Sequence, residues 1–430
     1  MDYKLYTLPS GLRVLISTMP GLESVTVTVW VKTGSRFEEK RINGISHFLE
    51  HMVFKGSSKR PTARDISTAV DSIGGEFNAA TSKDWTNFYI KSSASTVETA
   101  MDVLADMVFR PILDPEEIER EKGTIIQELN MYEDTPTMKI HDVFEELAFS
   151  GNPLAWDVGG KPESVKRIKR RDFDEYRSKH YTPENILISV SGGIAEKKAI
   201  SLVEKYFKSA SFNPRSRNTI STFKDPVFKA EQVKPQIKVK NKKVEQAHLI
   251  LGFLSDGRGY DGRFAQSVLS TILAGPMSSR LFIEVRERRG LAYAVRPSGD
   301  RFEDIGYFGV YAGVDLGKCE EAIRVILDQI YGISSGKFPI SDEELRKTKE
   351  YIKGHIALSL EDTQAVGDFF AEQALFLKEI LIPDEIYKRI DKVTAPDVIR
   401  EAKRLFVKSH LNLAVIGPYT NEAKFTKLLT

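Results

Sequence analysis

The segment RDFDEYRSKHYTPENILISVSGG, residues 171–193, resembles PDVIREAKRLFVKSHLNLAVIGP, residues 396–418, near the other end of the chain. A second pair of similar segments comprises DPEEIEREKGTIIQELNMYEDTP at 114–136 and SDEELRKTKEYIKGHIALSLEDT at 341–363. The two pairs are separated by nearly the same number of residues, which indicates a tandem duplication. The sequence therefore predicts two related domains in one chain.

Each predicted domain mixes strands with helices. In the first half, VTVTVWV at 25–31 and EFNAATSKDWTNFYIKSSA at 76–94 have the alternation and turn residues of strands. Helical segments lie beside them in blocks, which favours an α+β fold with a mostly antiparallel sheet and packed helices in each domain. We expect the domains to cover residues 1–215 and 236–430, with a linker at 216–235.

Composition limits the partners and the compartment. The 430 residues include 62 Lys and Arg against 60 Asp and Glu, and a net charge of +2 favours neither nucleic acid nor an anionic membrane as partner. No stretch approaches the roughly 18 apolar residues of a membrane span, and MDYKLYTLPSGLRVLIS lacks the apolar core of a signal peptide. The single cysteine, Cys319, excludes an intrachain disulfide and fits a reducing compartment. We expect a soluble, cytoplasmic protein.

The motif HFLEH at residues 47–51 carries the clearest chemical signal. His47 and His51 are four residues apart, so on a helix their imidazoles share one face and could bind one ion. Two imidazole nitrogens suit Zn²⁺ and leave room for a carboxylate ligand and a water. Glu50 could then accept the proton of the zinc-bound water. The competing interpretation is the polar edge of an amphipathic helix, but the chain has only 7 histidines.

A third ligand is expected from the acidic segment 116–133. Glu121 and Glu128 lie seven residues apart on one helical stripe, about 10 Å along the axis, so both cannot bind the same ion directly. One of them would be the ligand and the other a supporting or substrate-facing group. The spacing alone does not say which.

Four motifs, in order and spacing, make the chain similar to the M16 metallopeptidases, the family of pitrilysin, insulin-degrading enzyme and mitochondrial processing peptidase. They are HFLEHMVFKG, GGEFNAATSKDWTNFY, EREKGTIIQE and SSRLFIEVRERRGLAYAV. The resemblance spans nearly the whole chain. It implies the short form of the family, in which one chain carries two related α+β domains and forms half of a clamshell closed by a second chain.

The resemblance also implies roles for the residues of the metal motif. It makes His47, His51 and Glu128 the zinc ligands, because the family's distant glutamate follows the second histidine by some 77 residues. Glu50 becomes the general base, and Glu121 becomes the upstream partner that supports the site.

Two residues of the second half also match family positions. Arg286 and Tyr293, in RERRGLAY, match the Arg/Tyr pair that binds substrate and stabilises the tetrahedral intermediate. In long-chain members that pair comes from the half-shell facing the zinc, so here it could act within its own chain or on a second copy. Without the resemblance, the pair would be interpreted as an exposed arginine and a core tyrosine.

The predicted function is a zinc endopeptidase, acting as a homodimer on short or unstructured peptides. One zinc per chain follows, because the counterpart of HFLEH in the second half is QSVLS at 266–270. A non-catalytic partner or assembly subunit of the same fold is the alternative, and zinc hydrolysis of a non-peptide bond is a third interpretation. An exposed strand edge in GGEFNAATS favours peptides, which would bind through their backbone. The expected substrate-binding residues are Phe77, Asn78, Ala79 and Ala80.

Overall fold

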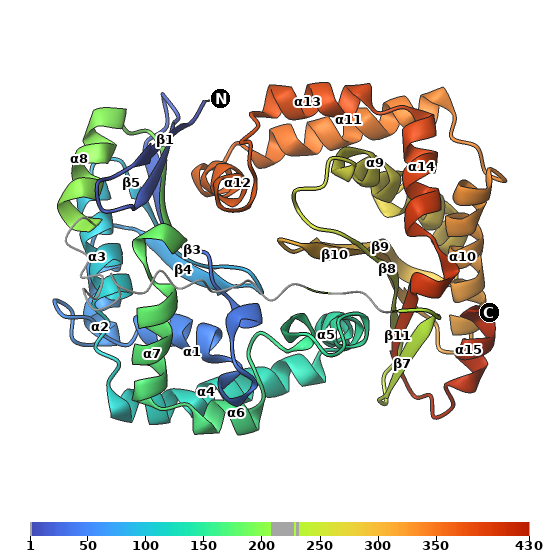
Figure 1. Ribbon diagram of the computed structural model, residues 1–430, viewed down its shortest axis with the longest axis horizontal. Coiled ribbons are helices and arrows are strands. Elements are labelled where there is room, and N and C mark those ends of the chain that lie inside the picture. The colour runs from blue at the N-terminus through green and yellow to red at the C-terminus, as the bar shows by residue number, and fades with distance from the viewer. Residues whose placement is uncertain (1, 208–227, 229–231, 430) are drawn as a thin grey trace. The chain divides into compact units, whose positions relative to one another are not determined.

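The computed structural model describes residues 2–207, 228 and 232–429 of the chain (Figure 1). Most of the predicted linker, 216–235, lies outside the described residues. By its internal contacts the chain forms two compact units. Unit 1 comprises Met1–Asn130, Trp156–Pro226 and Ser359–Ile382, and unit 2 comprises Met131–Ala155, Val227–Leu358 and Pro383–Thr430.

Unit 1 contains a six-stranded sheet with the strand order β1-β2-β6-β3-β5-β4. Strands β2 and β6 are parallel, and all other neighbouring strands are antiparallel. Because β4 ends the sheet, one of its edges has no strand partner among the described residues. The strands are β1 (Lys4–Thr7), β2 (Arg13–Thr18), β3 (Ser24–Val31), β4 (Glu76–Thr81), β5 (Thr86–Ser93) and β6 (Ile186–Gly192).

Unit 2 repeats this topology in a five-stranded sheet with the order β7-β11-β8-β10-β9. Strands β7 and β11 are parallel, as β2 and β6 are in unit 1, and the other neighbouring strands are antiparallel. Strands β7 to β11 therefore correspond in chain order to β2 to β6. This agreement confirms the predicted α+β fold of two related, mostly antiparallel sheets with packed helices. The strands are β7 (Gln236–Asn241), β8 (Ala247–Asp256), β9 (Ala292–Arg301), β10 (Ile305–Val314) and β11 (Leu411–Gly417).

Helices cover both sheets. Unit 1 contains α1 (Ile45–Val53), α2 (Ala63–Asp71), α3 (Val97–Phe109), α4 (Pro115–Asp134, as far as Asn130), α6 (Pro162–Arg167), α7 (Arg170–His180), α8 (Glu196–Phe207) and α12 (Thr363–Phe376). Unit 2 contains α5 (Pro136–Ala148), α9 (Arg263–Ala274), η6 (a π-helix, Phe282–Glu287), α10 (Cys319–Ser335), α11 (Asp342–Ser359, as far as Leu358), α13 (Pro383–Lys392), α14 (Ala395–Leu405) and α15 (Ala423–Leu429).

The two halves of the sequence exchange one helix each. Helix α5 comes from the first half but packs on strands β11, β8 and β7 of unit 2. Helix α12, which follows α11 as α5 follows α4, packs on β6, β3 and β2 of unit 1 (Figure 1). The predicted domain ranges assign these two helices by sequence half, whereas the contacts assign each to the opposite unit.

The alternation along the strands explains how each sheet is covered on two faces. In β3, Val25, Val27 and Val29 face the main core of unit 1, which they share with α1, α3, α7 and α8. The opposite face of β3 carries Thr26, whose hydroxyl lies 2.8 Å from that of Thr363 at the start of α12. Since successive side chains of a strand point to opposite faces, both faces of the sheet are buried under helices at β3.

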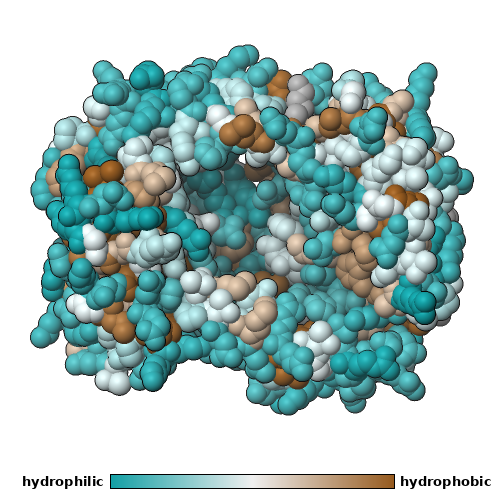
Figure 2. Space-filling view, turned by 180° about the vertical axis from the view of Figure 1, so that it is seen from behind, coloured by the Kyte–Doolittle hydropathy of each residue, from teal (hydrophilic) through white to brown (hydrophobic). Residues whose placement is uncertain are grey.

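The surface seen in Figure 2 is mostly hydrophilic, with apolar residues scattered singly or in small groups. Such scattered apolar residues are usual on a folded protein. Among the described residues, no helix combines the length and the apolar character needed to cross a membrane.

Candidate metal centre

Helix α1 presents the motif because its apolar residues recur at helical spacing. Five of them are fully buried, Ile45, Phe48, Leu49, Met52 and Val53. His47 and His51 therefore lie on the opposite side, with side chains 14% and 20% exposed. Their Nε2 atoms lie 3.2 Å apart, so both imidazoles point to one place.

Helix α4 brings two carboxylates to this pair. Glu128 lies beside both Nε2 atoms, with its oxygens 3.7 Å from that of His47 and 3.4 Å from that of His51. Glu121 lies on the other side of the His51 ring, where its Oε1 is 2.9 Å from Nδ1. Lys55, one turn beyond His51, contacts the second oxygen of Glu121 at 2.6 Å.

These positions fit a zinc ion. Two imidazole nitrogens and one carboxylate oxygen, from His47, His51 and Glu128, lie within 4.8 Å of one another. This donor set is one that zinc accepts, with a position left for water or substrate. Glu121 holds Nδ1 of His51, which leaves Nε2 as the nitrogen available to a metal. Among the described residues, this is the one group of three or more such side chains that could hold a metal.

The charges of the site favour a cation. Burial lowers the pKa of His51, but hydrogen bonds with Glu121 and Glu128 outweigh burial and raise this pKa to about 9. Burial and the neighbouring His51 lower the pKa of His47 to about 4. The hydrogen bond from His51 also lowers the pKa of Glu128. At neutral pH the metal-free pair of imidazoles thus carries one positive charge beside two carboxylates.

Glu50 is also on α1 but faces the edge strand β4. Its Oε2 accepts a hydrogen bond from the Thr81 hydroxyl at 2.5 Å. Burial raises the pKa of Glu50, while the Thr81 hydrogen bond lowers it. A carboxylate with a raised pKa is suited to accept and release a proton near neutrality.

The predicted peptide-binding residues lie on this edge strand. Side chains of β4 alternate, with Phe77 and Ala79 half-buried and Asn78 and Ala80 exposed. The Phe77 ring packs 5.5 Å from that of Phe54, just after α1. Strand β4 therefore runs beside α1 and ends at the threonine that holds Glu50, with its outer backbone edge free of strand partners in the described chain.

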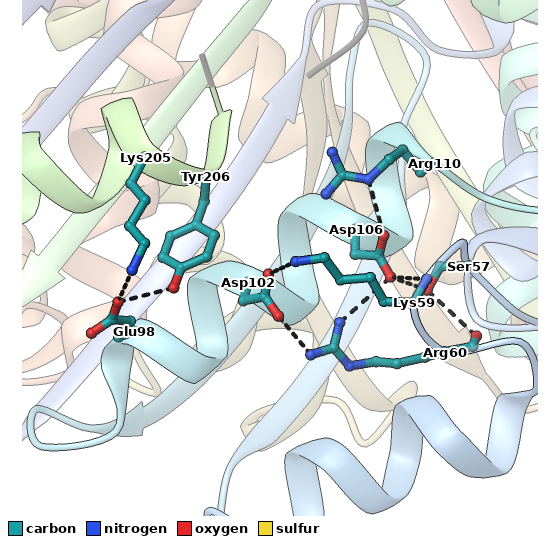
Figure 3. A network of polar contacts seen from close by, with 9 residues as sticks. All are labelled: Ser57, Lys59, Arg60, Glu98, Asp102, Asp106, Arg110, Lys205 and Tyr206. Atoms are coloured by element: carbon teal, nitrogen blue, oxygen red, sulfur yellow. Dashed lines mark hydrogen bonds and ion pairs between the residues drawn. The ribbon is translucent and has the colours of Figure 1, made fainter. Parts of the chain in front are cut away.

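Polar contacts fix the turn that follows α1 (Figure 3). Asp106 on α3 accepts hydrogen bonds from the Ser57 hydroxyl at 2.6 Å and from the Lys59 backbone N–H at 3.0 Å. Asp102, one turn earlier, pairs with Lys59 and also with Arg60 at 2.8 Å. The C-terminal side of the motif helix is thereby tied to the body of unit 1.

Arg286 and Tyr293 lie together in unit 2. Arg286 is in η6 and Tyr293 near the start of β9, and the guanidinium lies 5.3 Å from the centre of the tyrosine ring. Tyr293 is 73% exposed, so it is not a core tyrosine. Arg286 also lies over the ring of Phe282 at 4.8 Å. Both side chains are thus available at the surface of this unit.

Three residues near the site were not identified from the sequence. Lys55 and Thr81 contact the side chains of Glu121 and Glu50, and Glu38 contacts the start of α1. Lys55 lies four residues after His51, so helical spacing could have found it. Thr81 and Glu38 lie outside the helix. Thr81 is 31 residues from Glu50, and Glu38 comes from the irregular segment before α1, so helical spacing finds neither contact.

The chain matches known families along most of its length. Residues 13–160 match the family model described as insulinase (peptidase family M16), and residues 167–352 match the model described as the peptidase M16 inactive domain. An uncharacterized zinc protease from Bacillus subtilis is 35% identical over 418 residues, covering 97% of this chain and 99% of the relative. Another from Streptomyces coelicolor is 34% identical, covering 96% of this chain and 89% of the relative.

Solved structures with little sequence identity have the same fold. A protease from Helicobacter pylori superposes with a TM-score of 0.89 at 23% identity, covering 96% of this chain and 99% of that one. The peptidase M16 inactive domain from Pseudomonas fluorescens superposes with a TM-score of 0.88 at 16% identity, covering 98% of each chain. The two family models and the full-length relatives together establish that this chain belongs to peptidase family M16, in its short two-domain form.

Proposed function

We propose that this protein is a zinc-dependent endopeptidase that hydrolyses short or unstructured peptides, with Glu50 as the general base. The observation that carries the proposal is one cluster. In it His47, His51 and Glu128 converge beside the half-buried carboxylate of Glu50 and a strand edge that has no strand partner among the described residues. The names of the relatives, zinc proteases from several bacteria, support the same activity.

When bound, zinc would supply a Lewis acid that activates water and polarises a peptide carbonyl. The chain supplies the remaining functions. Glu50 would take the proton of the attacking water and deliver it to the leaving amine, while Thr81 holds its carboxylate in place. Strand β4 would bind the peptide backbone by adding it as a further strand, with Phe77, Asn78, Ala79 and Ala80 along that edge.

The second candidate function is a non-catalytic subunit of the same fold. The match of residues 167–352 to a model described as inactive favours it for the second half alone. In the first half, a non-catalytic role would leave the four groups His47, Glu50, His51 and Glu128 without a common purpose. We therefore propose one zinc per chain, in the first half, and a second half that binds substrate and helps to enclose it.

Metal removal tests the activity. We expect the protein to cleave unstructured peptides, to lose this activity when a chelator removes the metal, and to regain it when zinc is added back. The readout is mass spectrometry of the products of a mixed peptide library, which also reports the cleavage-site preference. Cleavage that survives complete zinc removal would contradict the proposal, and a metal-loaded protein without any peptide product would favour the non-catalytic subunit.

Glu128→Gln tests the third ligand, because a neutral amide is a poor replacement for a carboxylate. We expect this variant to lose zinc affinity by more than the roughly 10- to 100-fold typical of changing an outer partner. Glu121→Gln is the matched comparison, since it makes the same chemical change on the same helix but acts through Nδ1 of His51. Affinities are measured by chelator competition. Full metal occupancy in Glu128→Gln together with loss in Glu121→Gln would exchange the two assignments.

A further inference from the structure

The first turn of the metal helix is capped from outside the helix. Gly44, the residue before α1, has a φ of 98° and no side chain with which to accept the unpaired N–H groups of that turn. Glu38 accepts them instead, with 2.7 Å from the Gly44 N–H to Oε2 and 2.8 Å from the Ser46 N–H to Oε1. A carboxylate is the strongest acceptor for such N–H groups, and its negative charge interacts favourably with the positive end of the helix dipole.

Glu38 is itself held rigidly. It is only 5% exposed, and the side-chain amide of Asn43 donates a further hydrogen bond to its Oε2 at 2.9 Å. The segment just before it is anchored by a fully buried ion pair between Arg36 and Asp84 at 2.9 Å. Asp84 lies in the turn that follows β4. The same ion pair therefore connects the segment before Glu38 with the end of the predicted peptide-binding strand.

The other side of the same turn is closed by backbone. A Cβ on Gly44 would lie 2.5 Å from the carbonyl oxygen of Gly159, and one on Gly160 would lie 2.3 Å from that of Asn43. Ser164 donates its hydroxyl to the Asn43 carbonyl at 2.7 Å. Because neither side of the turn has room to shift, the position of the first helical turn is set where Glu38 binds it.

The two histidines differ in how their rings are held. The His51 ring has Glu121 at Nδ1, whereas Nδ1 of His47 is buried and has no hydrogen-bond partner among the described residues. His47 directly follows Ser46, whose N–H binds Glu38. Because no side chain holds the His47 ring from Nδ1, the backbone of the first turn has a larger part in placing this ring than in placing that of His51.

We propose that Glu38 is a positioning residue of the metal centre, which fixes His47 by capping α1 as Glu121 fixes His51 through its ring. This inference rests on the proposed zinc site. It predicts that zinc affinity depends on a carboxylate that lies outside the ligand set and outside the motif helix.

The test compares Glu38→Gln with the parent protein. The amide keeps the size of the side chain but loses the charge and can accept only through one oxygen, so one N–H of the first turn is left unpaired. We expect zinc affinity to fall about tenfold or more, within the range for groups that orient metal ligands. Burial raises the pKa of Glu38 to about 7 while its hydrogen bonds lower it, so the chelator competition is run at pH 8, where the carboxylate is charged.

Thr86→Val is the matched control for a general loss of stability. Thr86 is buried in unit 1 and donates its hydroxyl to the Thr33 carbonyl at 3.0 Å, away from the first turn of α1. Unfolding of both metal-free variants is followed by circular dichroism, and the absorption of bound Co²⁺ reports the ligand geometry. We expect the Co²⁺ spectrum to change only in Glu38→Gln. We also expect only this variant to lose more than about threefold in zinc affinity.

The outcomes separate this inference from the proposed function. If the parent binds no zinc, the proposed function fails, whereas unchanged zinc affinity in Glu38→Gln overturns the positioning role alone. An equal loss in Thr86→Val also overturns it. If Glu38→Gln does not fold, Glu38→Asp keeps the charge but is one methylene too short to reach both N–H groups. We then expect Glu38→Asp to show the same loss of about tenfold in zinc affinity, and an affinity equal to that of the parent would overturn the positioning role of Glu38.

Discussion

Replacing Glu50 by glutamine is expected to leave zinc bound and to reduce peptide turnover by about a hundredfold or more. The amide has nearly the shape of the carboxylate and can still accept the Thr81 hydroxyl, which lies 2.5 Å from the native Oε2. It cannot accept the proton of an attacking water. Because Glu50 lies beside the three converging side chains and is not one of them, the metal should be unaffected.

The measurement pairs metal analysis with steady-state kinetics on an unstructured peptide. Glu116→Gln is the matched control, since it is the same change on the exposed first turn of α4 and should leave both quantities unchanged. If zinc is lost from Glu50→Gln together with activity, then Glu50 is a ligand and its assignment as base is wrong. Retained activity with bound zinc would instead assign proton transfer to another group.

The fold and most positions of the site could be predicted because they follow from short-range patterns. Helical spacing placed His47 and His51 on one face, and the repeated segments predicted two related sheets, which the matching strand orders confirm. The seven-residue spacing of Glu121 and Glu128 predicts that the two do not bind one ion directly. Both side chains reach the same imidazole, but at its opposite nitrogens.

Other features depend on contacts between distant segments, which no local pattern specifies. Which glutamate faces Nε2 is decided by how α4 packs on α1, and the sequence spacing left that choice open. The duplication predicts two related domains, but it does not say which sheet α5 or α12 covers. Glu38 is only six and eight residues from Gly44 and Ser46, but it lies in no helix or strand motif, and the irregular path of the chain between them brings it to their N–H groups.

The exposed pair in unit 2 leads to the second prediction. Arg286 and Tyr293 are stacked at the surface, so their polar groups could reach a substrate held by another part of the assembly. A developing oxyanion needs donors that are already in place, and the loss of one such donor costs about a hundredfold or more in turnover. We propose a homodimer in which each active site combines the zinc residues of one chain with the Arg/Tyr pair of the other. Closing two chains around a peptide would also exclude folded proteins by size.

Complementation between two inactive variants tests this arrangement. Glu50→Gln chains and Tyr293→Phe chains are mixed under conditions that allow subunits to exchange. In a mixed dimer with shared sites, one site receives both defects and the other neither. Random exchange makes about half of the dimers mixed, so activity should return to about a quarter of the parent value per chain.

A second mixture is the control that separates shared sites from other causes of recovery. Glu50→Gln mixed with Glu128→Gln places both defects among the zinc residues, so no dimer contains an intact site in either arrangement, and activity should stay at the level of the separate variants. Heterodimers are verified by differently tagged chains. If tagged heterodimers form and the mixture of Glu50→Gln with Tyr293→Phe stays inactive, the proposed arrangement is wrong in one of two ways. Either Arg286 and Tyr293 act within their own chain, so that every site in the mixed dimer keeps one defect, or both sites of a dimer must be intact for turnover.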